Sequence, residues 1–236
     1  SMWDFLEKNN LRNKLFRWFF KSNFELAICT NDGTCGVKWM KKAIRPGVKQ
    51  KFLMNGVEKK KHRQVNIRKK NKFRVCFIGR LESIKGCFEF VRAISLLTNK
   101  IKRKICVFII GTGSQEESLK SLSRRLALDE IITFKKRIPH KEMKDIHNIC
   151  DIYVSLNKLG NLSNANLECF SNGICSIIPD FNEENLADLD GRKYFPDESL
   201  IRIPISDQES ELAKAITDLV RNPKKIEKYS KYFIFC

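Results

Sequence analysis

Two basic side chains follow directly after an apolar run in the stretch FIGRLESIKG, residues 77–86. The run closes at Gly79, where backbone can approach a ligand closely, and Arg80 comes next with a guanidinium that can bind two oxygen atoms at once. Lys85 adds a point charge near the expected start of a helix, whose N-terminus carries a partial positive charge. This arrangement predicts a diphosphate site; two exposed cations beside a turn are the alternative.

A single carboxylate lies in the stretch GNLSNANLECFSNG, residues 160–173. A helix that begins at Ser163 would direct its free backbone amides at an anion, and Glu168 would lie about one and a half turns into that helix. A carboxylate can accept hydrogen bonds from two neighbouring hydroxyl groups, such as those of a ribose. The stretch therefore predicts a nucleotide contact; a glutamate that only complements the helix dipole is the alternative.

The stretch IIGTGSQEE, residues 109–117, contains two glycines with one residue between them. A dinucleotide fingerprint needs a third glycine, and Glu116 stands in its place. We therefore expect Gly111 to make a tight turn near a ligand, with Ser114 as the N-cap of the next helix and Glu117 completing a capping box.

The elements that position these residues are short apolar runs separated by segments with helical periodicity. The runs are residues 73–79, 104–111, 131–134, 151–156, 175–179 and 200–204. Apolar strands that alternate with helices predict an α/β fold, a Rossmann-like doubly wound parallel sheet buried on both faces. Ligands bind beyond the carboxyl ends of the strands in such sheets, which is where the candidate residues lie.

The first 57 residues do not follow this alternation. ELAICT and KFLMNGV predict two strands, and residues 3–21 predict a basic amphipathic helix. Such a helix packs on a neighbouring domain or lies on an anionic membrane, and both interpretations stay open. The charged run at residues 58–72 is interpreted as a solvated linker, since it lacks the aromatic side chains of a nucleic-acid surface.

Composition restricts the function classes. The chain has 236 residues and a formal net charge of +18, which favours anionic partners such as nucleotides, nucleic acids or anionic membranes. Its nine cysteines form no CxxC pair and its three histidines are scattered, so we expect free thiols, no metal site and a cytoplasmic protein. Contact with the inner face of a membrane stays open.

Five segments in register resemble the C-terminal half of the family 4 retaining glycosyltransferases. They are GRLESIKG, VFIIGTGSQEESLKSL, ITFKKRIPHKEM, CDIYVSLNKLGNLSNANLECFSNG and SDQESELAKAITDLVRNP. The resemblance covers residues 73–222 and extends more weakly over residues 25–57. It implies the GT-B fold, in which two Rossmann-like domains face each other and the second holds the sugar nucleotide.

The resemblance also implies roles for single residues. Arg80 and Lys85 would bind the donor diphosphate and offset its charge during the reaction, and Glu168 would bind the ribose. The other implied donor-binding residues are Gly79, Gly111, Arg137, Ile138, Asn161, Leu162, Ser163 and Asn164. No metal and no cofactor besides the nucleotide-sugar donor, linked to UDP or GDP, would be needed.

The sequence departs from the family pattern in two places. Gly160 stands where the family has the first of two glutamates, which would contact the sugar. PDFNEENLADLDG, residues 179–191, stands where the family has a Gly-Gly turn, so we expect its acids to shape a different pocket rim.

Length sets the expected domain organisation, because two domains of roughly 100 to 200 residues each would need about 350 residues. We expect the end of an acceptor domain in residues 1–57, the linker in residues 58–72, the donor domain in residues 73–222 and a final helix in residues 223–236. Such a truncated chain should bind a nucleotide but transfer little or no sugar.

The predicted function is transfer of a sugar from a nucleotide donor to the hydroxyl group of an unknown acceptor, with retention, in the synthesis of cell-surface glycans or polysaccharides. A glycan or a lipid-linked glycan would be the acceptor. Two alternatives stay open. Gly160 and the short chain suggest a non-catalytic nucleotide-binding module, and the net charge of +18 suggests a nucleic-acid-binding protein.

Overall fold

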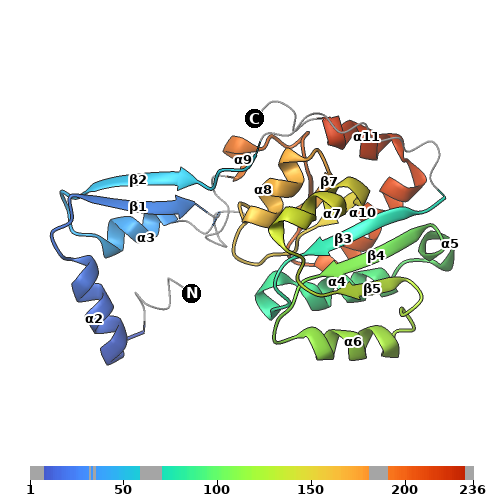
Figure 1. The fold of residues 1–236 in the computed structure, drawn as a ribbon, viewed down its shortest axis with the longest axis horizontal. Coiled ribbons are helices and arrows are strands. Elements are labelled where there is room, and N and C mark those ends of the chain that lie inside the picture. Colours follow the sequence, from blue (N-terminus) through green and yellow to red (C-terminus); the bar gives the residue numbers. More distant parts are fainter. Residues whose placement is uncertain (1–7, 32, 34–35, 59–70, 181–190, 232–236) are drawn as a thin grey trace.

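The computed structural model describes residues 8–31, 33, 36–58, 71–180 and 191–231. They form a small unit, which ends at residue 58, and a larger α/β unit, which begins at residue 71 (Figure 1). Most of the predicted linker, residues 59–70, and most of the acidic stretch, residues 181–190, lie outside the described residues. Within the described part of the chain, no helix combines the length and the apolar character needed to cross a bilayer.

A six-stranded parallel sheet forms the centre of the larger unit, with the order β5-β4-β3-β6-β7-β8. Its strands are β3 (Phe73–Ile78), β4 (Ile105–Ile110), β5 (Ile132–Lys135), β6 (Ile152–Val154), β7 (Cys175–Asp180) and β8 (Ile201–Pro204). The chain runs outward from β3 to β5 and returns to β6 on the other side of β3. The predicted doubly wound sheet is thus confirmed, and its strand order reverses between β3 and β6.

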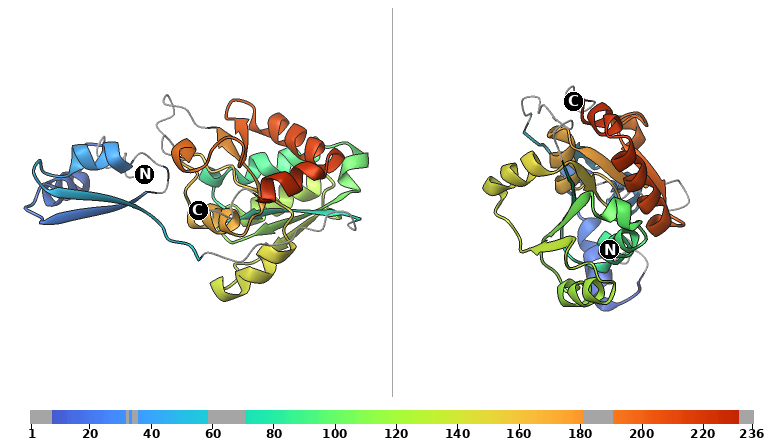
Figure 2. Two further views of the ribbon diagram at one scale, coloured as in Figure 1. Left: turned by 90° about the horizontal axis from the view of Figure 1, so that it is seen from above. Right: turned by 90° about the vertical axis from the view of Figure 1, so that its right-hand side faces the viewer.

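Helices cover both faces of this sheet, as the end-on view in Figure 2 shows. The main core lies against one face and receives apolar side chains from α4 (Cys87–Ser95), α6 (Glu116–Arg125), α10 (Gln208–Arg221) and α11 (Lys224–Lys231). Smaller clusters on the other face involve α7 (Met143–Ile149) and α8 (Asn164–Ser171). Burial on both faces explains why the strands are almost continuously apolar. The short helices α5 (Asn99–Lys102) and α9 (Gly191–Tyr194) complete the unit.

The predicted start of α6 is wrong. The N-cap of α6 is Gln115, and its side chain makes no capping hydrogen bond. Ser114 instead donates two hydrogen bonds to the carboxylate of Glu82, from its backbone N–H at 3.0 Å and from its hydroxyl at 2.7 Å. The carboxylate of Glu82, in the loop after β3, therefore binds Ser114 one residue before the N-cap of α6.

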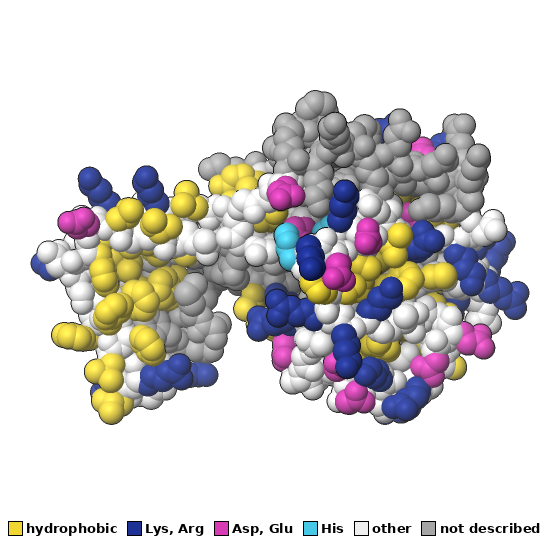
Figure 3. All heavy atoms as spheres, viewed as in Figure 1, with side chains coloured by type: hydrophobic (Ala, Val, Ile, Leu, Met, Phe, Trp, Pro, Cys, Tyr) yellow, Lys and Arg dark blue, Asp and Glu magenta, His cyan; other side chains and the backbone are white. Residues whose placement is uncertain are grey.

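The small unit pairs two parallel strands, β1 (Leu26–Asn31) and β2 (Lys49–Met54), which confirms both predicted strands. One face of this pair is covered by α3 (Gly36–Ala43), whose Trp39 and Met40 are buried against Ala27, Cys29 and Phe52. The predicted first helix is α2 (Leu11–Phe20), and residues 1–7 lie outside the described residues. Hydrophobic side chains gather on the visible face of the small unit (Figure 3).

Candidate functional site

A cleft of about 710 Å³ opens where β3, β4 and β6 end at their carboxyl termini. This is the point at which the strand order reverses, the usual ligand position in a doubly wound sheet. The arrowhead of β3 in Figure 1 points toward the small unit, so the cleft lies at the edge of the sheet that faces it. The cleft is lined by nine of the eleven predicted site residues: Gly79, Arg80, Lys85, Gly111, Arg137, Ile138, Ser163, Asn164 and Glu168.

The two cations come from the segment between β3 and α4. Arg80 is exposed directly after β3, and Lys85 is half-buried at the end of the 3-10 turn η2 (Ser83–Lys85). Gly86 then takes a left-handed conformation, with φ of 71°, as the N-cap of α4. A Cβ atom there would collide with the backbone and side chain of Leu156, so glycine permits both the turn and the close packing.

An acid also lies in this cleft beside the cations. Glu82 accepts both hydrogen bonds from Ser114, and these bonds hold its pKa below the ordinary glutamate value. The backbone N–H of Ser114 is the larger cause, and the positive charge of Arg80 lowers the pKa further. Glu82 is therefore ionised at neutral pH, and its carboxylate joins the loop after β3 to the loop after β4.

The two glycines of the β4 loop allow this loop to cross the β3 loop. A Cβ atom on Gly111 would overlap the carbonyl oxygen of Gly79, and one on Gly113 would overlap the carbonyl oxygen of Leu81. Hydrogen bonds join the loops as well, from Leu81 N–H to the Thr112 carbonyl and from Gln115 N–H to the Leu81 carbonyl, both at 3.0 Å. The GxG pattern thus serves close loop packing at the floor of the cleft.

A buried polar network fixes the start of α8. The helix begins at Asn164, one residue after the predicted Ser163, which is its N-cap and whose hydroxyl accepts a hydrogen bond from the Asn166 N–H. The Asn166 side-chain oxygen accepts hydrogen bonds from the Tyr153 hydroxyl at 2.8 Å and the Ser163 hydroxyl at 2.9 Å. Its amide nitrogen donates to the Asn161 carbonyl at 3.0 Å. These bonds hold the helix N-terminus toward the cleft.

Sequence reasoning did not identify Tyr153 and Asn166 as site residues, although both line the cleft. Two signals were available: the tyrosine lies inside an apolar strand, and the asparagine lies on the buried side of a helix. Each indicates a hydrogen-bonding partner nearby, because a buried polar group needs one.

Two histidines flank the predicted ribose-binding carboxylate. Glu168 Oε1 lies 3.1 Å from Nε2 of His140, which is exposed, and Glu168 Oε2 lies 3.9 Å from Nε2 of His147, which is buried. Asn172 contacts Nδ1 of His147 at 3.4 Å through its amide nitrogen. His140, His147 and Glu168 are separated in the sequence, so their spacing did not predict that they would lie together.

Two predicted residues do not line the cleft. Leu162 is fully buried in a cluster with Leu167 and Phe170, and the Asn161 side chain donates to the Pro179 carbonyl at 2.9 Å. Both side chains secure the loop before α8, and the predicted role of the backbone amides of residues 162–164 stays a prediction. Gly160 is held in the same loop, because the Asn157 side chain donates to its carbonyl at 2.6 Å.

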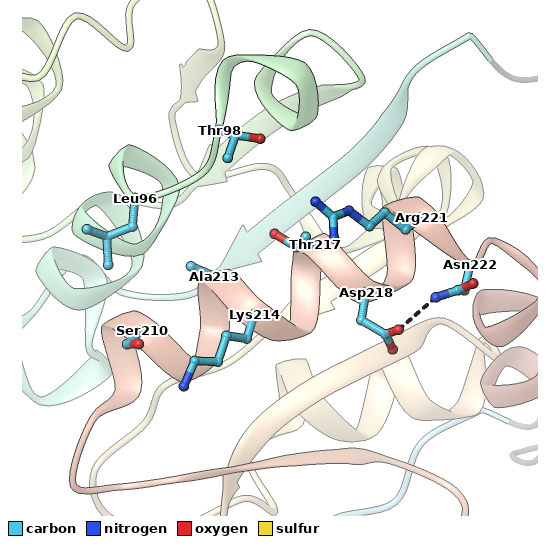
Figure 4. Close-up of a pocket in the computed structure, with 9 residues that line it drawn as sticks. All are labelled: Leu96, Thr98, Ser210, Ala213, Lys214, Thr217, Asp218, Arg221 and Asn222. Atoms are coloured by element: carbon cyan, nitrogen blue, oxygen red, sulfur yellow. Dashed lines mark hydrogen bonds between the residues drawn. The ribbon is translucent and has the colours of Figure 1, made fainter.

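A second hollow of about 560 Å³ lies between the end of α4 and the exposed side of α10 (Figure 4). Among its lining residues, Asp218 accepts hydrogen bonds from Asn222 at 2.8 Å and from Lys225 at 2.7 Å. None of the predicted site residues lines this hollow.

Comparison with known proteins gives a consistent picture. The model of the family described as Glycosyl transferases group 1 matches residues 58–233. The uncharacterized glycosyltransferase MJ1069 of Methanocaldococcus jannaschii is 30% identical over 123 residues, which are 52% of this chain and 31% of the relative.

Solved structures of low sequence identity show the same fold. Anabaena Alr3699/HepE in complex with UDP and glucose superposes with a TM-score of 0.76 at 13% identity, over 97% of this chain and 63% of that one. The pneumococcal O-GlcNAc transferase GtfA in complex with UDP and GlcNAc superposes with a TM-score of 0.68 at 15% identity, over 89% and 41%. This chain spans less than two thirds of the length of each of the three proteins.

Proposed function

Since this chain belongs to the family Glycosyl transferases group 1, we propose that its cleft holds the nucleotide of an activated sugar and that the protein transfers this sugar to an acceptor hydroxyl. One observation carries the proposal. Arg80, Lys85, the N-terminus of α8 and Glu168 line a single cleft at the point where the strand order reverses. Together they offer two cations and free amides for a diphosphate and a carboxylate for a ribose.

The donor diphosphate becomes more negative as the bond between the sugar and its phosphate oxygen breaks. Arg80 and Lys85 stabilise this developing charge, so we assign no metal and no cofactor to the site. We propose a retaining reaction in which the acceptor oxygen attacks from the side of the leaving group. The phosphate oxygen that is released takes the acceptor proton, and no residue acts as a nucleophile.

The donor that fits the proposal is a UDP-linked sugar, because two proteins of the same fold are described in complex with UDP. A GDP-linked sugar remains a competing donor. Arg137 and Ile138, which follow β5 at the edge of the cleft, would border the base. The acceptor would be a glycan or a lipid-linked glycan in cell-surface polysaccharide synthesis. The free thiols of the described cysteines suit a reducing compartment, so we place the reaction in the cytoplasm.

Isothermal titration calorimetry with UDP, GDP and ADP tests the site. Replacing Arg80 or Lys85 by alanine should weaken binding of the preferred nucleotide at least tenfold, because a charge-assisted hydrogen bond contributes about 1.5 to 3 kcal/mol. Lys104→Ala is the matched control, since this exposed lysine lies before β4, at the opposite edge of the sheet. Unchanged affinity in the double variant Arg80→Ala/Lys85→Ala would contradict the proposal.

A non-catalytic nucleotide-binding module is the second candidate, and Gly160 is the observation that favours it. The carboxylate that the family pattern places here is missing, and the Gly160 carbonyl is engaged by Asn157. A sugar-transfer assay on this chain, run beside the nucleotide titrations, separates the two functions. Nucleotide binding without transfer would support the module.

A further inference from the structure

Glu82 is an acid in the cleft that we assign to a diphosphate, where its own charge opposes the ligand. Both carboxylate oxygens of Glu82 are engaged by one residue. Oε1 accepts a hydrogen bond from the Ser114 backbone N–H at 3.0 Å, and Oε2 accepts one from the Ser114 hydroxyl at 2.7 Å. Hydrogen bonds to an ionised acceptor are stronger than neutral ones. This pair therefore joins residues 79–82, which follow β3, to residues 111–115, which follow β4.

The backbone on either side of Arg80 is held against β4 and the loop after it. The Gly79 N–H donates to the Ile110 carbonyl at 3.0 Å. The Leu81 N–H donates to the Thr112 carbonyl at the same distance. The Arg80 side chain lies exposed between these two points, and it makes no hydrogen bond or ion pair with another described residue. The place from which its guanidinium reaches into the cleft is therefore set by the backbone of this loop.

The charge of Glu82 lies near Arg80 but is not paired with it. Arg80 is close enough for its positive charge to contribute to the lowered pKa of Glu82. No ion pair joins these two residues, both of which the structure describes. Because both oxygens of Glu82 bind Ser114, the guanidinium of Arg80 stays available for a ligand.

We propose that Glu82 is a positioning residue, whose hydrogen bonds to Ser114 hold the loop after β3 in the place from which Arg80 binds the donor diphosphate. The inference rests on the proposed function, because it concerns the same ligand. Two other roles for Glu82 predict different results. A carboxylate that contacts the ligand itself would act without Arg80, and one that only repels the diphosphate would strengthen binding when it is removed.

Titrations of the intact chain with UDP and with uridine test the proposal. Uridine lacks the diphosphate, so an effect that is transmitted through Arg80 should appear with UDP alone. Glu82→Ala should weaken UDP binding about fivefold, because it removes both hydrogen bonds that hold the loop. This loss should not exceed that of Arg80→Ala. The affinity for uridine, followed by ligand-observed NMR, should stay unchanged.

Glu82→Gln is the conservative variant. A glutamine carbonyl can accept the Ser114 N–H while the glutamine NH₂ group donates to the Ser114 hydroxyl oxygen, so two neutral hydrogen bonds can replace the charged ones. We expect this variant to recover most of the UDP affinity that Glu82→Ala loses. Ser114→Ala removes only the hydroxyl donor, and its affinity should lie between those of wild type and Glu82→Ala. Equal losses in Glu82→Gln and Glu82→Ala would contradict a role through these hydrogen bonds.

A double-mutant cycle with Arg80 separates positioning from direct contact. In an Arg80→Ala background, Glu82→Ala should change UDP affinity by less than about twofold, because the side chain through which Glu82 acts is gone. Glu117→Ala is the matched control, since it removes an exposed carboxylate from α6 only three residues after Ser114. It should leave UDP affinity unchanged in both backgrounds. Circular dichroism and urea unfolding check that each variant keeps its fold.

Three results would overturn the positioning role of Glu82. The first is an equal loss of UDP and uridine affinity in Glu82→Ala, which would indicate a general disturbance of the cleft. The second is a full additional loss in the Arg80→Ala background, which would assign a direct contact to Glu82. The third is unchanged or increased UDP affinity in Glu82→Ala while Arg80→Ala weakens binding. If wild type does not bind UDP, or Arg80→Ala binds it as wild type does, the assignment of the diphosphate to Arg80 fails, and this inference fails with it.

Discussion

The carboxylate of Glu168 is held between two histidines, and this surrounding defines what the residue can do. His147 lies buried, with its Nε2 atom 3.9 Å from one oxygen, and His140 contacts the other oxygen at 3.1 Å from an exposed position. A carboxylate in this place can accept hydrogen bonds from two adjacent hydroxyl groups of a ligand.

Replacement of Glu168 by glutamine tests this role. We expect UDP affinity to fall about tenfold or more, because glutamine keeps the size but loses the charge that strengthens hydrogen bonds from the ribose. Calorimetry should also compare UDP with 2′,3′-dideoxy-UDP. Wild type should prefer UDP, and Glu168→Gln should lose that preference. Glu117→Gln on the exposed side of α6 serves as control. An unchanged preference would mean that Glu168 does not contact the ribose.

At the scale of elements, the site depends on loops that cross where the strands end. The backbone of Gly111 has φ of 148°, a conformation that other residues rarely adopt, and its Cα faces the Gly79 carbonyl. Arg80 follows Gly79 in the chain, so a displacement of this crossing moves the guanidinium as well.

Gly111→Ala should therefore lower both stability and nucleotide affinity. We expect the free energy of unfolding to fall by about 2 kcal/mol or more, from backbone strain and overlap, and calorimetric UDP binding to weaken with it. Urea unfolding measures the first effect. Gly56→Ala is the control, because a Cβ atom at Gly56 meets no neighbour within 4 Å and should change neither quantity. Equal stability of the two variants would show that the loops adjust freely.

Elements were predictable where local pattern decides them, and contacts between loops were not. The six strands of the larger unit follow from apolar runs, because a parallel sheet buries both of its faces. The strands of a parallel sheet end at one edge, so Arg80, Lys85 and Glu168 could be predicted to line one cleft. The predicted capping role of Ser114 is wrong because Glu82, 32 residues earlier in the sequence, binds it. The histidines beside Glu168 come from the 3-10 turn His140–Glu142 and from α7. Spacing along a chain cannot reveal such pairs.

At the scale of the whole molecule, buried thiols make stability depend on alkaline pH. Burial raises the pKa of Cys87 to about 11 from an ordinary value of 9.0, and burial also raises the pKa values of Cys150, Cys169 and Cys175. The folded protein keeps these thiols protonated, whereas the unfolded chain ionises them. Their contribution is complete below pH 9 and is lost as the pH rises through the folded values.

Urea unfolding at a series of alkaline pH values checks this. Between pH 9 and pH 11 the free energy of unfolding should fall, by at most about 1.4 kcal/mol per thiol and pH unit. Cys87→Ala should lower stability at neutral pH by leaving a small cavity and should also reduce the alkaline slope. Cys29→Ala, at a half-buried position of the small unit, should leave the slope as it is. A slope unaffected by Cys87→Ala would assign the alkaline sensitivity to other groups.

The side chain of Asn55, at the end of the small unit, donates a hydrogen bond of 2.5 Å to Asn164, the first residue of α8. Asn164 also lines the cleft, so a ligand that takes its side-chain oxygen would break the hydrogen bond to Asn55. Because linkage is reciprocal, a movement of the small unit that breaks this bond would change the affinity of the cleft for such a ligand by the same free energy. Ligand binding in the cleft and the position of the small unit would thus be coupled through Asn164.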